Sequence, residues 1–153
     1  MTRHVVYTGG TFDLFHYGHV NLLKTCRRLA GQSGKVIVSL NTDEFIYEYK
    51  KQNPVCSYEE RKACLEACKY VDFVIPNIGG ADSKPSIEEA RPTIIVIGTD
   101  WAKRDYYSQM QFTQEWLDDK GIVLAYVPYT LGVSTSSIKQ RLQNAFEIEN
   151  KII

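Results

Sequence analysis

The sequence predicts one α/β domain, residues 1–153, in which helices cover both faces of a doubly wound parallel sheet of about five strands. Short apolar runs alternate with helix-like segments along the chain. These runs are apolar at consecutive positions, as is typical of parallel strands buried on both faces. No linker, internal repeat or low-complexity segment divides the chain. A length of 153 residues is enough to bury a hydrophobic core without disulfides.

The strands are predicted from runs of branched apolar residues that end at turn-forming residues. The run Ile94-Ile95-Val96-Ile97 carries the strongest signal. Pro76 and Pro128 each end a run, because proline has no backbone N–H to donate to a sheet. The predicted strands are residues 5–8, 35–40, 71–75, 93–97 and 122–127.

The helices are predicted from apolar residues at helical spacing and from capping residues. Leu22, Leu23, Cys26 and Ala30 show this spacing. Ser57 precedes Glu60 by three residues, which is the signature of a capping box. The predicted helices are residues 20–30, 43–49, 57–69, 86–90 and 107–120, and a last helix from Ser134 or Thr135 to about residue 149. Residues 77–85 are predicted to form a loop.

Composition disfavours nucleic-acid-binding, membrane-spanning and secreted proteins. The formal net charge is zero and the pI is about 6.8, which disfavours a nucleic-acid-binding protein with its usual basic excess. No apolar run approaches the ~20 residues that span a membrane. The four cysteines include no Cys-x-x-Cys pair, and the N-terminus has no signal-peptide pattern. A cytoplasmic protein with reduced thiols is therefore expected.

The most informative motif follows the first predicted strand. It reads Gly9-Gly10-Thr11-Phe12-Asp13-Leu14-Phe15-His16-Tyr17-Gly18-His19. A strand, a glycine turn and a helix start with two histidines can hold a phosphate chain, since backbone N–H groups and the helix dipole favour anions there. The chain has neither the Gly-x-Gly-x-x-Gly dinucleotide pattern nor a P-loop. Hydride transfer and P-loop hydrolysis are therefore disfavoured.

His16 and His19 allow three interpretations. A zinc pair needs further ligands, and His4 is the only other histidine. The two side chains could also be incidental surface residues. Phosphate ligands at a helix start are the interpretation that the surrounding pattern favours.

Polar residues also follow two later strands. Asp100 follows the fourth strand, and the run Gly132-Val133-Ser134-Thr135-Ser136-Ser137 opens the last helix. One serine suffices as a helix cap, so four successive hydroxyl groups indicate a second phosphate-binding helix start. The carboxyl ends of parallel strands lie at one edge of a sheet, which brings these residues toward the first motif.

The first motif resembles the first signature of the HxGH nucleotidyltransferases, the cytidylyltransferase family, and glycerol-3-phosphate cytidylyltransferases resemble it most. Further segments resemble that group in order and spacing, so nearly the whole chain is covered. They are Thr42-Asp43-Glu44-Phe45, Ser57-Tyr58-Glu59-Glu60-Arg61, Tyr70-Val71-Asp72-Phe73-Val74-Ile75-Pro76, Gly98-Thr99-Asp100-Trp101 and Gly132-Val133-Ser134-Thr135-Ser136-Ser137-Ile138. The resemblance implies a Rossmann-like fold and a homodimer.

The resemblance also implies the reaction. A small phosphomonoester, such as glycerol 3-phosphate, attacks the α-phosphorus of CTP in line, and pyrophosphate leaves. Mg²⁺ would arrive with the triphosphate, because no acidic cluster for a resident metal is evident in the sequence. No nucleic acid or membrane partner is expected.

The site residues implied by the resemblance fall into three groups. The catalytic group is His16 and His19 with Lys50 and Lys51, of which either lysine could face the phosphates. Arg61 and Lys69 match basic positions on and just after the capped helix; they are eight residues apart and are expected on roughly one face. Asp13 could cap its turn instead, and Lys84 could be a solvated charge. The nucleotide-binding group is Gly10, Thr11, Phe12, Tyr17, Gly18, Lys69, Asp100, Tyr129, Thr130, Gly132, Val133, Ser134, Thr135 and Ser136, and the acceptor-binding group is Asp13, Arg61 and Lys84.

Two departures from the family pattern leave alternatives open. Tyr129 stands where the family has an arginine, which removes a permanently charged phosphate donor that Lys103, Arg104 or Arg141 could replace. Gly79 and Gly80 stand where the family often has a tryptophan. The alternatives are an ATP-dependent adenylyltransferase with the same mechanism and a non-catalytic nucleotide-binding module.

Overall fold

The computed structural model describes residues 3–98, 106–128 and 130–152. Its centre is a five-stranded sheet in the order β3-β2-β1-β4-β5, and every pair of neighbouring strands is parallel. The strands are β1 (Val5–Gly10), β2 (Lys35–Leu40), β3 (Phe73–Pro76), β4 (Ile94–Gly98) and β5 (Val123–Val127). The predicted Rossmann-like α/β fold is confirmed.

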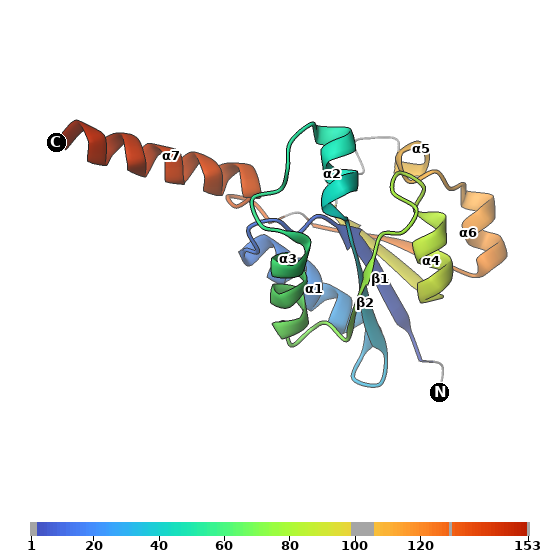
Figure 1. The fold of residues 1–153 in the computed structure, drawn as a ribbon. Helices are drawn as coiled ribbons and strands as arrows, with labels where there is room; N and C mark the ends of the chain where they lie inside the picture. The colour runs from blue at the N-terminus through green and yellow to red at the C-terminus, as the bar shows by residue number, and fades with distance from the viewer. Residues whose placement is uncertain (1–2, 99–105, 129, 153) are drawn as a thin grey trace.

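The helices are α1 (Tyr17–Ala30), α2 (Asp43–Lys50), α3 (Tyr58–Ala67), α4 (Lys84–Ala90), α5 (Tyr106–Met110), α6 (Gln114–Lys120) and α7 (Thr135–Ile152). Figure 1 shows α1 and α3 on one side of the sheet and α4 and α6 on the other. In the same view α7 extends away from the rest of the molecule.

Alternating side chains of β1 build a core on each face of the sheet. Val6 packs with Cys26 of α1 in one cluster. Tyr7 packs with Ile87 of α4 and Leu117 of α6 in another. Successive strand residues point to opposite faces, so the apolar run of β1 serves both layers. This is the pattern from which a doubly covered sheet was predicted.

The strand order indicates that a ligand would bind beside β1. From β1 the chain passes to β2 on one side, and β4 then pairs with β1 on its other side. In open parallel sheets, ligands bind at the carboxyl ends of the strands where the order reverses in this way. The motif of residues 9–19 leaves β1 at that point.

The prediction of one helix over residues 107–120 was wrong. Two helices, α5 and α6, occupy this stretch. Gln111 between them has a φ of 59°, which a helix cannot continue through. The Thr113 side chain then caps α6 by accepting a hydrogen bond from the N–H of Trp116 at 3.1 Å.

The expected common face of Arg61 and Lys69 was also wrong. Helix α3 ends at Ala67, and Cys68 is its C-cap in an extended conformation. Lys69 therefore lies outside the helix, where it is exposed, whereas Arg61 is buried. Other boundaries differ by a few residues: α1 begins before Val20, α4 before Ser86, and β3 includes Pro76.

Across the described residues, no helix has the length and apolar character needed to cross a membrane.

Candidate active site

The turn between β1 and α1 holds unusual backbone conformations. Phe12 and Leu14 have φ values of 52° and 49°, in the left-handed region that side-chain-bearing residues rarely adopt. Such conformations cost about 1–3 kcal/mol each and are found where surrounding contacts impose them, often at functional sites. Here they lie at the carboxyl end of β1.

The carboxylate of Asp13 holds this turn in place through hydrogen bonds. It accepts hydrogen bonds from the backbone N–H groups of Val55 at 2.7 Å, Cys56 at 2.8 Å and Leu14 at 3.1 Å. Asp13 is only 5% exposed. Its bonds join the turn to the segment before α3, so the structure shows the turn-supporting alternative for Asp13. The acceptor contact stays a prediction.

His16 and His19 form a reciprocal cap at the start of α1. Nδ1 of His16 accepts from the N–H of Gly18 at 3.1 Å, and Nδ1 of His19 accepts from the N–H of His16 at 3.2 Å. An imidazole whose Nδ1 accepts a hydrogen bond carries its neutral-state proton on Nε2. Both side chains therefore have an Nε2–H group with which to donate to a ligand.

Burial keeps these imidazoles neutral. It lowers the pKa of His19 from its ordinary value near 6.5 to about 3, with neighbouring His16 lowering the pKa further and Asp13 opposing the shift. Burial also lowers the pKa of His16. At neutral pH the pair offers hydrogen-bond donors without positive charge.

Aromatic rings hold the pair in place. The imidazoles of His16 and His19 stack with their centroids 3.7 Å apart. His19 also stacks on Phe15, with centroids 5.6 Å apart, and contacts Phe12 at 5.1 Å. A side chain fixed on several sides loses little freedom when it binds a ligand, which favours preorganised donation.

Gly18 lets the last predicted signature approach the first. A Cβ built on Gly18 would lie 2.9 Å from Cε1 of His16 and 3.3 Å from Cγ1 of Val133. The first distance is shorter than real Cβ contacts, so His16 would have to move. Glycine at position 18 therefore lets His16 and Val133 keep their positions without a clash.

One hydrogen bond joins these signatures directly, and a second joins the residues next to them. Thr135 donates from Oγ1 to the backbone oxygen of Asp13 at 2.9 Å. Asn21 of α1 donates from Nδ2 to Oγ1 of Thr130 at 3.1 Å. Gly132 between them has a φ of 82°, which suits glycine. The start of α7 is thereby held beside the start of α1.

Serines cap the start of α7. Oγ of Ser134 accepts from the N–H of Ser137 at 3.0 Å, and Oγ of Ser137 accepts from the N–H of Ser134 at 2.8 Å. Two helix N-termini therefore lie next to one another. Their dipoles and backbone N–H groups favour an anion between them, and the binding of a phosphate chain there stays a prediction.

Arg61 supports the turn from the interior. Its guanidinium, 0% exposed, pairs with the carboxylate of Asp43 at 2.6 Å. It also donates to the backbone oxygens of Cys56 at 3.0 Å, Thr11 at 2.9 Å and Asn41 at 2.8 Å. Arg61 was predicted to contact the acceptor, but its side chain has no exposed surface in the structure.

The predicted lysines occupy different surroundings. Lys50 and Lys51 are exposed at the end of α2, and Lys51 caps that helix with a φ of 58°. Tyr49, beside them, lies with its hydroxyl 3.3 Å from Oγ1 of Thr11, so this helix end faces the turn. Lys84 instead forms an ion pair with Asp82 at 2.9 Å.

The remaining predicted residues divide into three cases. A Cβ on Gly10 would lie 3.0 Å from the ring of Phe12, so glycine permits the tight turn there. Tyr17 is 65% exposed, and Ser136 is also exposed. Asp100 and Tyr129 lie outside the described residues. Whether each contacts a nucleotide stays a prediction.

Sequence reasoning missed several residues that shape the site. Asn41 donates from Nδ2 to Oγ1 of Thr11 at 3.1 Å, which adds to the contact of Tyr49. Asn21 and Asp43 also hold the site through the contacts described above. Asn41 and Asp43 belong to the polar run directly after the second strand, at the edge where ligands bind, and this position could have indicated them.

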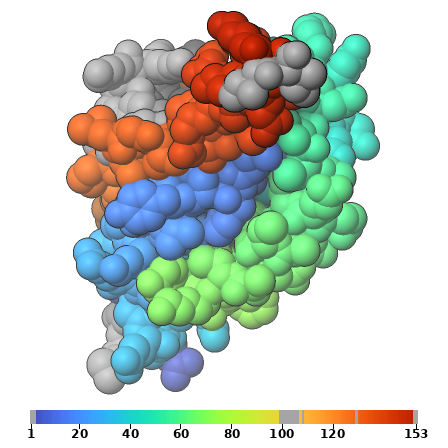
Figure 2. All heavy atoms as spheres, turned by 90° about the vertical axis from the view of Figure 1, so that its left-hand side faces the viewer, coloured from blue at the N-terminus to red at the C-terminus, as the bar shows by residue number. Residues whose placement is uncertain are grey.

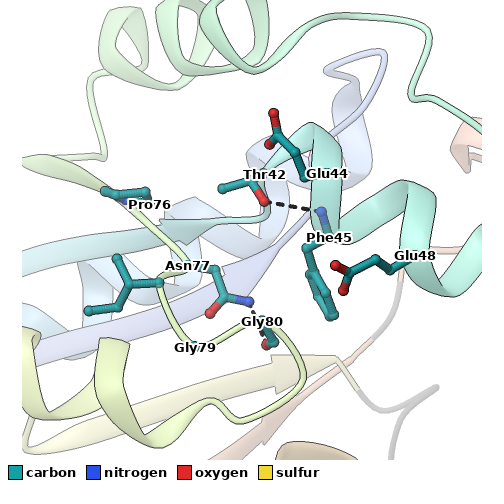
Figure 3. Close-up of a pocket in the computed structure, with 9 residues that line it drawn as sticks. Thr42, Glu44, Phe45, Glu48, Pro76, Asn77, Gly79 and Gly80 are labelled. Carbon is teal, nitrogen blue, oxygen red and sulfur yellow. Dashed lines mark hydrogen bonds between the residues drawn. The ribbon is translucent and has the colours of Figure 1, made fainter.

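A pocket of about 430 Å³ lies at the carboxyl ends of β2 and β3. Its lining includes Glu44, Phe45 and Glu48 of α2, and Figure 3 shows the Phe45 ring extending toward the segment with Asn77 and Gly80. Nδ2 of Asn77 donates to the backbone oxygen of Gly80 at 2.9 Å. Gly79 and Gly80, which stand where the family often has a tryptophan, thus line an open pocket.

No group of three His, Cys, Asp or Glu side chains suited to a metal ion occurs within residues 3–98, 106–128 and 130–152.

Comparison with known proteins identifies the family. The cytidylyltransferase-like family model matches residues 7–141. The chain is 39% identical to the glycerol-3-phosphate cytidylyltransferase of Staphylococcus aureus over 137 residues, 90% of this chain and 93% of the relative. It is 32% identical to the FAD synthase of Korarchaeum cryptofilum over 144 residues, 92% of each chain.

Among solved structures, a lipopolysaccharide core biosynthesis protein of Thermoplasma volcanium has the same fold. The TM-score is 0.65 at 24% identity, covering 84% of this chain and 98% of that one. With the HxGH turn formed at the switch point of a Rossmann-like sheet, these matches show that the chain belongs to the cytidylyltransferase-like family and is a nucleotidyltransferase.

Proposed function

We propose that the protein transfers a cytidylyl group from CTP to glycerol 3-phosphate or a similar polyol phosphate and releases pyrophosphate. The observation that carries this proposal is the reciprocal cap of His16 and His19, with both Nδ1 atoms occupied by backbone N–H groups. This cap leaves two neutral Nε2–H donors beside two adjacent helix N-termini. Similarity to the Staphylococcus aureus enzyme supports the choice of CTP and glycerol 3-phosphate.

The triphosphate binds between the starts of α1 and α7 in this proposal. The bonds from Thr135 to Asp13 and from Asn21 to Thr130 support it, because they hold the two helix starts together. Helix dipoles and backbone N–H groups provide attraction for phosphate without any buried cation. Mg²⁺ would enter with CTP and would neutralise charge on the phosphates.

Transfer is an in-line displacement at the α-phosphorus. A phosphate oxygen of the acceptor forms a bond to this atom while the bond to pyrophosphate breaks, and pyrophosphate leaves with that electron pair. Negative charge on the transferring group increases hydrogen bonding from His16 and His19. One preorganised donor of this kind typically lowers the barrier by about 3 kcal/mol.

The acceptor lies toward α2 in this proposal. Lys50 and Lys51 are exposed there and can attract its phosphate. The nearby pocket carries the carboxylates of Glu44 and Glu48, which accept hydrogen bonds from hydroxyl groups and repel a second phosphate. A small polyol with one phosphate suits this combination.

Histidine substitutions test the proposal. His16→Ala and His19→Ala should each lower kcat/KM for CTP and glycerol 3-phosphate more than about 100-fold, because each removes a transition-state donor. His4→Ala is the matched control, since His4 is exposed and contacts Thr93 at 3.2 Å. Pyrophosphate release measures turnover. Near-normal rates in both site variants would contradict the assigned role.

The second candidate is an adenylyltransferase, which the match to a FAD synthase favours. Thermal shifts with CTP, ATP, GTP and UTP distinguish the two. Stabilisation by ATP alone would exclude the cytidylyl proposal, whereas stabilisation by CTP with turnover supports it.

A further inference from the structure

The ends of three neighbouring strands carry polar side chains that are joined in one row. Thr11, Asn41 and Asn77 directly follow β1, β2 and β3, whose last residues are aligned by the sheet register. Nδ2 of Asn77 donates to Oδ1 of Asn41 at 3.0 Å, and Nδ2 of Asn41 donates to Oγ1 of Thr11 at 3.1 Å. This strand-end row of Thr11, Asn41 and Asn77 crosses the edge of the sheet at which ligands bind in such folds.

One end of the strand-end row forms part of the pocket beside α2. Asn77 lines this pocket, and its Nδ2 also donates to the backbone oxygen of Gly80 at 2.9 Å, as Figure 3 shows. Oγ of Ser86, a buried residue, donates to Oδ1 of Asn77 at 3.3 Å. The Asn77 amide is therefore held through both its oxygen and its nitrogen, which fixes its orientation.

The other end of the strand-end row holds the turn that leads to the two histidines. Thr11 precedes Phe12, whose φ of 52° persists only where surrounding contacts impose it. Figure 2 shows two other neighbours of this region, the start of α7 in orange and the segment around α3 in green, with α1 in blue between them. These neighbours bond to Asp13, but none of the described residues that bond to Asp13 lines the pocket. The strand-end row, in contrast, connects the turn to the pocket directly.

We propose that Asn41 and Asn77 are positioning residues, which keep the pocket at a fixed distance from the nucleotide-binding turn. This inference rests on the proposed function, because it places the acceptor in the pocket beside Asn77. In-line displacement requires the acceptor oxygen to be aligned with the α-phosphorus, and a misplacement of about 1 Å can lower the rate about 100-fold. The two amides act on this alignment through the turn and the pocket, without touching the reacting atoms.

Steady-state kinetics with CTP and glycerol 3-phosphate tests the positioning role. Asn41→Ala and Asn77→Ala should each lower kcat at least about 10-fold, because alignment is lost even when both substrates are saturating. The KM for CTP should change less than about 3-fold, since neither variant removes the groups at the two helix starts. A normal kcat in either variant, or a loss confined to KM, would overturn the inference.

A double-variant cycle tests whether the two amides act through one connection. Because the same hydrogen bond is lost in each single variant, the double variant should lose about 10-fold in kcat, whereas independent losses would multiply to about 100-fold. Asn21→Ala combined with Asn77→Ala is the matched control, since Asn21 contacts Thr130 and lies outside the strand-end row. Losses should multiply in this control. Losses that also multiply for Asn41 and Asn77 would overturn the inference.

Hydrogen exchange of the substrate-free chain separates this inference from the proposed function. Asn77→Ala should raise the exchange rates of the backbone amides of residues 11–14 at least about 3-fold, although Asn77 contacts them only through Asn41. Asn144→Ala, which removes an exposed amide on α7, should leave these rates unchanged. Unchanged rates in Asn77→Ala would overturn the connection. Raised rates in a chain whose wild type does not turn over CTP with glycerol 3-phosphate would instead contradict the proposed function and support the connection.

Discussion

The pH dependence of the free energy of unfolding reports whether the His19 imidazole stays neutral in the folded protein. In the unfolded chain this imidazole takes a proton near its ordinary pKa of 6.5, whereas burial lowers the pKa in the folded protein to about 3. Between these pH values the unfolded state binds the additional proton, so the free energy of unfolding falls as the pH falls. Each pH unit costs about 1.4 kcal/mol, which amounts to about 2 kcal/mol at pH 5.

Urea denaturation at pH 7 and pH 5 provides the assay, with His19→Gln as the comparison. Glutamine can accept the hydrogen bond from the His16 N–H but does not titrate. All other groups titrate in both proteins, so the difference between their pH dependences isolates His19. The wild-type protein should lose about 2 kcal/mol more than the variant. Equal losses would refute the depressed pKa and with it the neutral donor.

Two further substitutions separate activity from stability. Gly18→Ala should lower turnover at least about 10-fold, because the added Cβ displaces the His16 side chain, while thermal melting changes little, since the helix propensity of alanine offsets a weakened His16 cap. A stable variant with normal turnover would contradict the close approach. Arg61→Met should lower the free energy of unfolding in urea by about 3 kcal/mol, since it strands buried backbone oxygens. Lys69→Met at an exposed position should change it by less than about 0.5 kcal/mol, and equal effects would contradict the buried role.

The strands and their burial on both faces were predictable, because the apolar runs in the sequence are the segments that pack in the core. In β1, Val6 and Tyr7 serve opposite faces, and a parallel sheet is the arrangement that buries both. The break between α5 and α6 was not predictable in this way. It depends on a positive φ at Gln111, a residue type with no strong preference for that conformation.

The sequence indicated the two histidines of the candidate site, but it did not indicate which residues hold the turn around them in place. His16 and His19 stood out because two imidazoles at a helix start have few structural explanations. Arg61 resembled a phosphate ligand, because sequence shows a cation and cannot show that the folded chain surrounds it with backbone oxygens and Asp43. Asn41 was not predicted as a site residue, because amide side chains are common at strand ends and its contact with Thr11 depends on tertiary structure.

Product formation from CTP and glycerol 3-phosphate tests the central claim most directly. Phosphorus NMR of the wild-type protein with both substrates and Mg²⁺ should show pyrophosphate and a phosphodiester-linked cytidine product appearing in equal amounts. The His16→Ala variant should form both more than about 100-fold more slowly. Nucleotide binding without product from any nucleotide and phosphomonoester tested would contradict the account.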